Sequence, residues 1–398
     1  MTADDRISAE PIFRNRGIGR EMAVVGAGAV GLTAAADLAR QAVDVTVYER
    51  GEVAGGASGR AAGVCYDAFT TDPDATLGAK ALDRFRRFAD DGAPFEPCPY
   101  VWLVQAGDAE HARAVRDGLE RMQELGVGAT ELDADVLADR FSGLRTDDVA
   151  VAGATDGAGY TDPGRYTEWL AGRAEEHGAT IETNTPVAAA TDPPRVIPDG
   201  GPEREFDAVL VAAGAHSANL LADAGAPIAM KPYRVQALVG GVSRTSSASG
   251  ETAVTGPMWY DATADCYARP HPEGLLAGDG TERREADPGG YDREADADFP
   301  ATLASRVTHR LPDLSLDVRE AWAGLCTATP DRDPLVGVVR EGLYVATGFQ
   351  GQGFMRSPAI GRRVADQMLG DEGIPAFDPT RFGGDEPFDV RPGMAIEP

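Results

Sequence analysis

Lysine is nearly absent from this chain of 398 residues, in which only Lys80 and Lys231 occur. Basic residues number 37 against 64 acidic ones, which gives a formal net charge of −27. Because so negative a surface repels phosphate, the composition argues against nucleic-acid binding. The acidic residues are spread over the whole chain rather than gathered in a tail, as in proteins that work in molar salt. We therefore predict a halophilic protein.

Cysteine is also scarce, and the four examples are Cys65, Cys98, Cys266 and Cys326. None forms a C-x-x-C pair, and no histidine stands at metal-ligand spacing, so we predict neither a disulfide framework nor a metal site. No apolar run approaches the roughly 18 residues of a membrane-spanning helix. The first 21 residues are polar, unlike a secretory signal. We expect a cytoplasmic protein with an unstructured leader at 1–21, and translation could start at Met1 or Met22.

Glycine, by contrast, is abundant, with 48 residues, and the first cluster reads G-A-G-A-V-G at 26–31. This cluster joins an apolar run at 23–26 to a segment of helical spacing at 30–40, and a second apolar run follows at 43–48. A strand, a glycine turn, a helix and a second strand in this order predict a dinucleotide-binding βαβ unit.

Each residue of this unit has an expected role. Gly26 allows the tight turn, Gly28 lets the backbone approach a pyrophosphate, and Gly31 lets the helix pack against the strand. The helix N-terminus offers free N–H groups to the phosphates. Glu49 closes the second strand, where an acid accepts hydrogen bonds from a ribose 2′-OH and repels a 2′-phosphate.

The rest of the chain predicts further elements: helices at 74–91, 108–125 and 301–311, and strands at 206–213, 232–242, 266–277 and 342–347. For the last helix, Ser357 is the expected N-cap, Pro358 the first helical residue and Gly370 the residue past the end. Apolar runs followed by glycines recur near residues 24, 210 and 345. We therefore expect a discontinuous nucleotide-binding domain with another domain inserted between its pieces.

Several motifs follow the first one in a fixed order: GGASGR at 55–60, GYTDP at 159–163, VAAGAHS at 211–217, KPYRVQ at 231–236, YARP at 267–270, WAG at 322–324 with TPDRDP at 329–334, and GFQGQGF at 348–354 with PAIG at 358–361. Together they resemble the FAD-dependent amine and amino-acid oxidoreductases of the D-amino-acid oxidase superfamily, which includes monomeric sarcosine oxidase and glycine oxidase. The resemblance covers residues 22–370.

The resemblance implies an α/β fold of two domains, a Rossmann-like FAD-binding domain and a substrate domain with a mostly antiparallel sheet. The FAD-binding domain is expected at 22–70, 150–228 and 325–375, the substrate domain at 71–149 and 229–324, and a tail at 376–398. The expected FAD-binding residues are Gly26, Gly28, Gly31, Glu49, Arg50, Ser58, Arg60, Gly63, Val187, Ala213, Gly214, Gly324, Gly348, Gln350, Gly351, Gln352, Gly353 and Phe354.

Departures from the family pattern narrow the subclass. Gly324 stands where sarcosine oxidase links its flavin to a cysteine, and Cys326 lies two residues later, about 6.6 Å along a strand. We therefore expect non-covalent FAD, with attachment at Cys326 as the lesser alternative. Leu276 replaces the lysine that assists the reaction with oxygen, which favours a dehydrogenase that passes electrons to a carrier.

The arginines that grip a substrate carboxylate in glycine oxidase are also missing, because Cys326 and Gly351 stand at their positions. Arg269, Arg60 and Arg356 are the substitutes that the chain offers. The residues predicted to act on the substrate are Arg269, Tyr267, Gln352 and Arg60, with Trp259 and Tyr260 as further candidates for the pocket wall.

The leading prediction is an FAD-dependent oxidoreductase that oxidises the C–N bond of a small or N-methylated amino acid, of sarcosine, dimethylglycine or proline type, by hydride transfer to flavin N5. One alternative is a D-amino-acid or 2-hydroxy-acid dehydrogenase. The other is a non-catalytic FAD-binding protein that serves in assembly or electron transfer. The expected partners are the substrate and an electron carrier, and the oligomeric state stays open.

Overall fold

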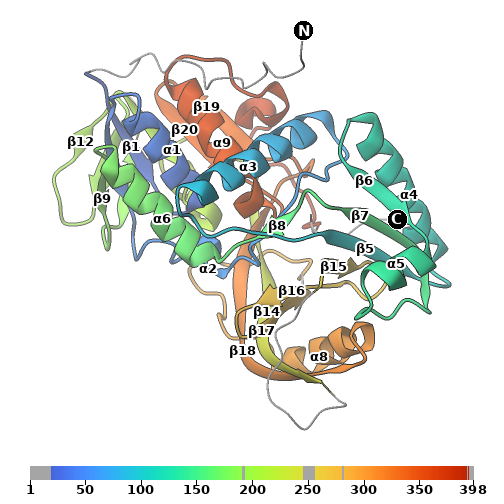
Figure 1. Cartoon of the computed structure of the whole chain (residues 1–398). Coiled ribbons are helices and arrows are strands. Elements are labelled where there is room, and N and C mark those ends of the chain that lie inside the picture. The colour runs from blue at the N-terminus through green and yellow to red at the C-terminus, as the bar shows by residue number, and fades with distance from the viewer. Residues whose placement is uncertain (1–18, 191–192, 245–255, 280–281, 392, 394–398) are drawn as a thin grey trace.

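The computed structural model describes residues 19–190, 193–244, 256–279, 282–391 and 393. Two large sheets form its framework (Figure 1). The first has six strands, in the order β19 (Leu335–Arg340), β20 (Leu343–Thr347), β13 (Ala208–Val211), β1 (Glu21–Val25), β2 (Asp44–Tyr48) and β9 (Thr180–Glu182). Neighbouring strands run parallel, except in the hairpin of β19 and β20.

Both faces of the six-stranded sheet are covered. Met22 and Val24 of β1 pack on one face, and Ala23 and Val25 pack on the other. The first face carries α1 (Ala29–Ala39), α3 (Asp72–Asp90), α6 (Pro163–Glu176) and α9 (Gly353–Met368); the second carries α7 (Ser217–Asp223) and a small sheet of β10 (Val187–Ala190), β11 (Arg195–Pro198) and β12 (Arg204–Glu205). Strands buried on both faces have nearly unbroken apolar sequences, which made these strands recognisable.

The second sheet has eight strands, in the order β18 (Leu314–Ala328), β14 (Lys231–Arg244), β17 (Gly274–Asp279), β16 (Cys266–His271), β15 (Met258–Asp261), β5 (Tyr100–Gln105), β7 (Val149–Thr155) and β6 (Ala129–Leu132). Only β15 and β5 pair in parallel. Val101 and Leu103 face α5 (Ala134–Arg140) and α8 (Phe299–Arg310). Tyr100 and Trp102 point to the opposite face, which α4 (Ala109–Glu124) shares.

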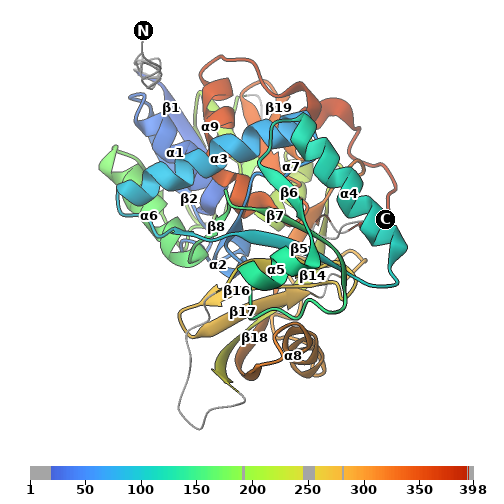
Figure 2. The same cartoon turned by 45° about the vertical axis from the view of Figure 1, so that its right-hand side comes forward.

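Short elements connect the two parts. They are α2 (Ala57–Arg60), which contacts both α6 and β18, and a sheet of β3 (Val64–Cys65), β8 (Gly159–Tyr160) and β4 (Glu96–Pro97). Figures 1 and 2 show the six-stranded sheet and its helices in the upper part of the molecule, with β14, β17, β18 and α8 below. The expected α/β fold with a mostly antiparallel second sheet is confirmed.

One predicted helix start is wrong. The last helix, α9, begins at Gly353 with Gln352 as N-cap, so Pro358 lies inside the helix and Ser357 does not cap it. A serine followed by proline is typical of a helix start, but Met355 and Ile360 pack into the core on either side of the proline and hold the helix together. Gly370 follows the helix at φ +102°, as expected.

Two elements pack differently from the expected domain bounds. Leu77 and Phe85 of α3 join the core of the six-stranded sheet, although 71–149 was assigned to the substrate domain. Strand β7 belongs to the eight-stranded sheet, although most of it falls in 150–228. The other bounds stay a prediction. The leader, except for residues 19–21, lies outside the described residues.

No helix among the described residues is long and apolar enough to cross a membrane. Within the same residues, no three metal-binding side chains gather at one point. The four cysteines are all described, and each is a free thiol.

Candidate active site

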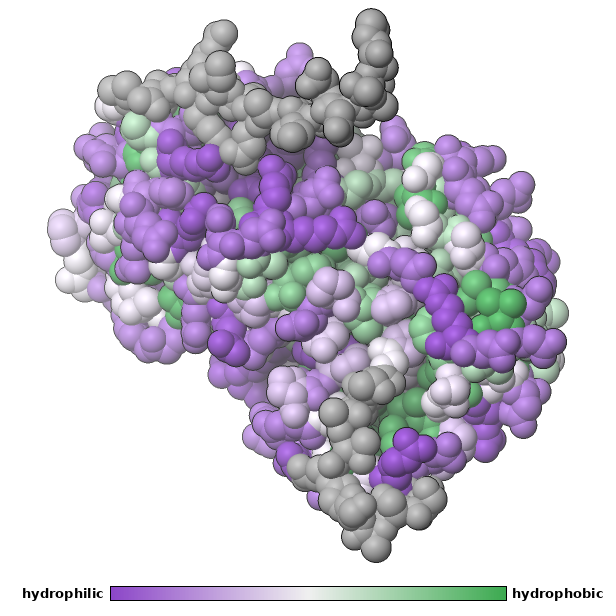
Figure 3. All heavy atoms as spheres, viewed as in Figure 1, coloured by the Kyte–Doolittle hydropathy of each residue, from purple (hydrophilic) through white to green (hydrophobic). Residues whose placement is uncertain are grey.

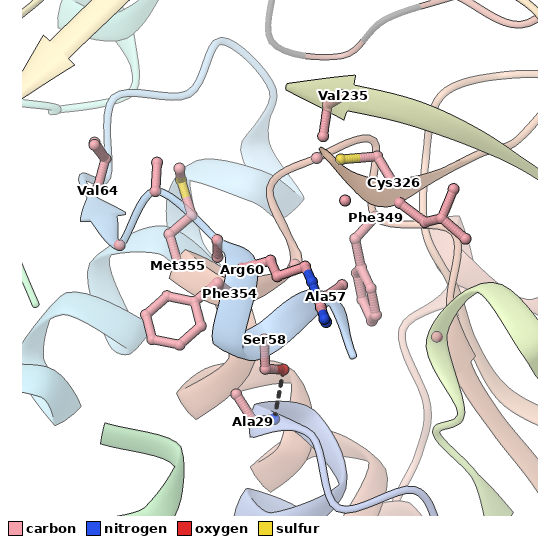
Figure 4. Close-up of a pocket in the computed structure, with 18 of the residues that line it drawn as sticks. Ala29, Ala57, Ser58, Arg60, Val64, Val235, Cys326, Phe349, Phe354 and Met355 are labelled. Atoms are coloured by element: carbon pink, nitrogen blue, oxygen red, sulfur yellow. Dashed lines mark hydrogen bonds between the residues drawn. The ribbon is translucent and has the colours of Figure 1, made fainter. Parts of the chain in front are cut away.

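A cavity lies between the two sheets and encloses about 1490 Å³ when the space open to solvent is counted. At one end it reaches the glycine turn before α1, and at the other it reaches β14, β16 and β18 of the eight-stranded sheet. Figure 4 shows Ser58 and Arg60 of α2, Phe349 and Phe354 of the last glycine loop and Cys326 of β18 around it. We call it the cofactor cavity.

The glycine turn admits no larger residues at two positions. Gly26 has φ +114°, and a Cβ there would lie 2.5 Å from the carbonyl oxygen of Ala212. A Cβ on Gly31 would lie 2.2 Å from the carbonyl oxygen of Gly26. Gly28 lines the cavity, and Ser58 Oγ accepts a hydrogen bond of 3.0 Å from the Ala29 N–H, the dashed line in Figure 4. The backbone is therefore close-packed behind the turn and open toward the cavity.

Glu49 stands at the end of β2, beside this turn. Its carboxylate accepts hydrogen bonds from the N–H groups of Ala27 and Gly51, both of 2.9 Å. It therefore clamps the glycine turn to the loop that follows β2, and its position suits a ribose diol. The neighbouring Arg50 is exposed, with Nη1 3.5 Å from His216 Nδ1. Burial and then Arg50 lower the pKa of His216, which favours a neutral ring.

Gly351 of the last glycine loop and Gly353 and Phe354 at the start of α9 line the cofactor cavity, as expected. Gly348 is needed for the turn, because its φ is +78° and a Cβ would lie 2.6 Å from Thr329 Cγ2. Gln350 and Gln352 line a second cavity instead of this one. Their expected contact with the cofactor is therefore not supported by where their side chains lie.

The remaining predicted cofactor residues divide into two groups. Gly63, Gly214 and Gly324 line the cavity. Ala213 lies between two lining residues, Ala212 and Gly214, and does not line it itself. Val187 begins β10 on the far face of the six-stranded sheet and does not line the cavity. Taken together, the glycine turn, the Glu49 clamp and the long cavity fit FAD.

Four tyrosines form the opposite wall: Tyr66, Tyr100, Tyr260 and Tyr267. The ring centroids of Tyr66 and Tyr100 are 5.0 Å apart, and Tyr260 donates a hydrogen bond to Asp265 Oδ1. A Cβ on Gly278 would lie 2.3 Å from the Tyr267 hydroxyl, so only glycine leaves room for that ring. Burial raises the pKa of Tyr267 and Tyr100, which keeps both phenols protonated.

Sequence reasoning found only half of this wall. Trp259, a candidate for the wall, is buried in the core on the opposite face of the sheet, because side chains alternate along β15. Tyr100 alternates with Val101 and Trp102, a pattern that could have revealed its face. Tyr66 follows the two-residue strand β3 and had no comparable signal.

The arginine candidates are mostly engaged elsewhere. Arg269 is 3% exposed, donates to the carbonyl oxygens of Ala62 and Pro270, and stacks on Tyr160. It lines neither cavity, so its expected contact with substrate is not supported, and it holds the loop before β3 in place.

Arg356 is buried, and its Nη1 lies 2.7 Å from Asp74 Oδ1 beside the second cavity. Of the arginines within the described residues, only Arg60 lines the cofactor cavity. Arg60 Nη1 donates 2.6 Å to the Gly55 carbonyl oxygen, and the Arg60 carbonyl oxygen accepts from Trp322 Nε1.

Cys326 of β18 lines the cavity beside Val235 of the neighbouring strand β14 (Figure 4). Burial raises the pKa of its thiol to about 12. A protonated thiol is a poor nucleophile, which speaks against attachment of a flavin here. Leu276 is buried within the sheet and does not line the cavity.

A second cavity, of about 1850 Å³ with its solvent-open space, adjoins the first. Tyr66, Tyr100 and Tyr260 line both. Its other walls come from α4, the start of α3 and the two glutamines of the last glycine loop.

The chain is similar to two known proteins over most of its length. Glycine oxidase from Geobacillus kaustophilus is 26% identical over 91% of this chain and 96% of its own length. The MnmC protein of Maricaulis maris, named for tRNA 5-methylaminomethyl-2-thiouridine biosynthesis, is 27% identical over 90% of this chain, which spans about half of that longer protein (53%).

Among solved structures, L-proline dehydrogenase from P. horikoshii superimposes with a TM-score of 0.80 at 24% identity, over 92% of this chain and 98% of that one. Glycine oxidase from G. kaustophilus gives a TM-score of 0.80 at 22% identity, over 91% and 99%. The family model DAO, FAD dependent oxidoreductase, matches residues 21–367. The chain therefore belongs to the DAO family of FAD-dependent oxidoreductases and is an enzyme that uses FAD.

Proposed function

We propose that the protein oxidises the C–N bond of a small or N-methylated amino acid, of sarcosine, dimethylglycine or proline type. The observation that carries this proposal is the cofactor cavity itself, which connects the glycine turn before α1 with a wall of four tyrosines. A substrate held against that wall lies in the same cavity as the cofactor.

Bound FAD supplies the two-electron acceptor for the hydride that leaves the substrate carbon. The chain holds this group through the turn at 26–31, the clamp of Glu49 and the glycines before α9. Arg60 is the cation best placed to meet an anionic group of cofactor or substrate, because it lines the cavity.

The tyrosine wall positions the substrate. The rings of Tyr100 and Tyr267 exclude water and offer apolar aromatic surface to the carbon atoms of the substrate. The described residues of the cavity wall include no histidine or lysine, and their carboxylate, Asp279, is paired with Arg306. We therefore propose that the amine binds unprotonated and that proton removal needs no separate base.

Three finer features belong to the same proposal. FAD is bound without a covalent link, since the Cys326 thiol stays protonated. Electrons pass to a carrier rather than to oxygen, since Leu276 stands where the family's lysine would. The enzyme works in a salt-rich cytoplasm, as its net charge of −27 suggests.

Product analysis tests the reaction. The FAD-loaded protein is incubated in high salt with sarcosine, dimethylglycine, proline or glycine, together with an artificial electron acceptor. We expect an aldehyde or a cyclic imine from at least one amine, in step with reduction of the acceptor and with little hydrogen peroxide in air. Absence of any carbonyl or imine product would refute the proposal. Abundant hydrogen peroxide would refute the transfer of electrons to a carrier rather than to oxygen.

A further inference from the structure

The second cavity has the size and the apolar walls to hold a larger group than a small amine. Phe69 and Trp102 supply aromatic walls, and Leu119 and Met122 of α4 supply aliphatic ones. The two cavities share Tyr66, Tyr100 and Tyr260 as lining residues, so a ligand whose amine lies in the first cavity would reach the second beside these rings. The space beyond the tyrosines is larger than glycine or sarcosine needs.

An unpartnered amide lies at this cavity. Gln350 lines it and is only 3% exposed, yet neither Nε2 nor Oε1 has a hydrogen-bond partner among the residues that the structure describes. The residue has φ +52°, an unusual backbone for a side chain, and its N–H donates 2.8 Å to the Thr327 carbonyl oxygen. Burial of an amide without partners is energetically costly. A ligand that both donates and accepts a hydrogen bond would remove this cost.

The neighbouring polar groups are already engaged. Gln352 donates to the Gly393 carbonyl oxygen and accepts from Arg356 Nη2. Arg356 Nη1 pairs with Asp74, whereas its Nε is buried and has no partner within the described part of the chain. Among the buried polar atoms of this wall that the structure describes, those without a partner are therefore the amide oxygen and nitrogen of Gln350 and the Nε of Arg356. One acceptor and two donors match a carboxamide rather than a cation.

We propose that the second cavity selects a substrate with a long arm, apolar along its stem and ending in a carboxamide-like group that pairs with Gln350. The arm is a side chain or an N-substituent of the amino acid. This inference rests on the proposed function, since it places the amine of the same substrate at the tyrosine wall.

A bulky side chain that fills the second cavity tests this proposal. Gly118 of α4 lines the second cavity, and a Cβ there would meet only Thr70 Cγ2, at 3.7 Å. Gly118→Phe therefore fills the cavity without a backbone clash. Gly172→Phe is the matched control, because Gly172 lies inside α6 and its Cβ would have nothing within 4 Å. Gln350→Leu removes the amide while keeping a side chain of similar size.

Binding is measured by calorimetry on FAD-loaded protein with sarcosine, N-benzylglycine and N-(4-carbamoylbenzyl)glycine. In the parent protein we expect the carboxamide to lower Kd about tenfold relative to the benzyl compound. Gln350→Leu should abolish this preference. Gly118→Phe should raise the ratio of Kd for each N-benzyl ligand to Kd for sarcosine about tenfold. Gly172→Phe should leave this ratio unchanged.

Two results would overturn the proposal. If Gly118→Phe raises Kd for sarcosine as much as for the two N-benzyl ligands, the second cavity is only a passage. If Gly118→Phe raises Kd for none of the three ligands, the second cavity does not hold the arm of the substrate. Calorimetry needs no turnover, so it separates this inference from the proposed function. N-Benzyl ligands that bind as expected while no amine yields product would refute the reaction and leave the binding site standing.

Discussion

At the scale of single residues, the site depends on side chains that fix the backbone around the cavity. Glu49 joins two loops through its carboxylate, and Arg269 of β16 holds the loop before β3 through the carbonyl oxygen of Ala62. The role of Glu49 could be predicted because its place after the second strand is set by the motif. The role of Arg269 could not, since a motif says nothing about where a guanidinium turns.

Replacement of Glu49 by glutamine should weaken FAD binding. Only one amide oxygen remains to accept from the Ala27 and Gly51 N–H groups, so the turn loosens and the ribose loses its anionic partner. We expect Kd for FAD to rise at least about tenfold, measured by flavin fluorescence. Glu52→Gln, on the same loop but bonded to Asn184, is the control. Equal Kd values for both variants would contradict the clamp.

Asp279 should control part of the pH dependence of stability. Burial is the main cause that raises its pKa from 3.8 to about 6, against the lowering effect of its ion pair with Arg306. Because the folded state holds this proton more tightly than the unfolded state, stability declines as pH rises from 4 to 6.

Asp279→Asn should remove that decline, since an amide resembles the protonated acid. We expect the variant to melt about 2–4 °C above the parent protein at pH 7 and at the same temperature near pH 4. If the parent protein instead melts at a higher temperature than Asp279→Asn at pH 7, the ion pair with Arg306 stabilises the carboxylate more than burial destabilises it.

At the scale of elements, the crossing of α1 and α9 sets the place of the last glycine loop. A Cβ on Gly361 of α9 would lie 2.5 Å from Thr33 Cβ and 2.8 Å from the Val30 carbonyl oxygen, both on α1. The βαβ unit and most helices could be predicted, because their spacing is local. The start of α9 could not, because packing rather than the Ser357-Pro358 pair decides it.

Gly361→Ala should therefore separate the two helices. We expect it to destabilise the protein by about 1–3 kcal/mol in chemical denaturation. Gly172→Ala, within α6 and open to solvent, should be neutral or stabilise by up to about 1 kcal/mol. If Gly361→Ala leaves the denaturation midpoint unchanged, the two helices can move apart freely and the close crossing does not matter.

At the scale of the whole molecule, two sheets of different design enclose one site between them. The order of the motifs predicted this division, but the contact of α3 with the six-stranded sheet and the tyrosine wall depend on long-range packing. The second cavity had no signal in the sequence, because α3, α4 and the last glycine loop meet there only in the fold. Hydrophilic residues cover most of the face in Figure 3, in keeping with the composition.

Salt should stabilise the whole molecule. A net charge of −27 repels itself, and this repulsion is screened only at high ionic strength. We expect the melting temperature to fall steadily as KCl is lowered from about 3 M to about 0.1 M. A melting temperature independent of salt over this range would refute the halophilic interpretation.

The proposed reaction is tested by the visible spectrum of the FAD-loaded protein, mixed without oxygen with sarcosine, dimethylglycine, proline, glycine and D-alanine in turn. We predict that the flavin band at about 450 nm bleaches with at least one secondary or tertiary amino acid. A band that persists with every amine, yet disappears with dithionite, would contradict it and favour a 2-hydroxy acid or a non-catalytic flavoprotein.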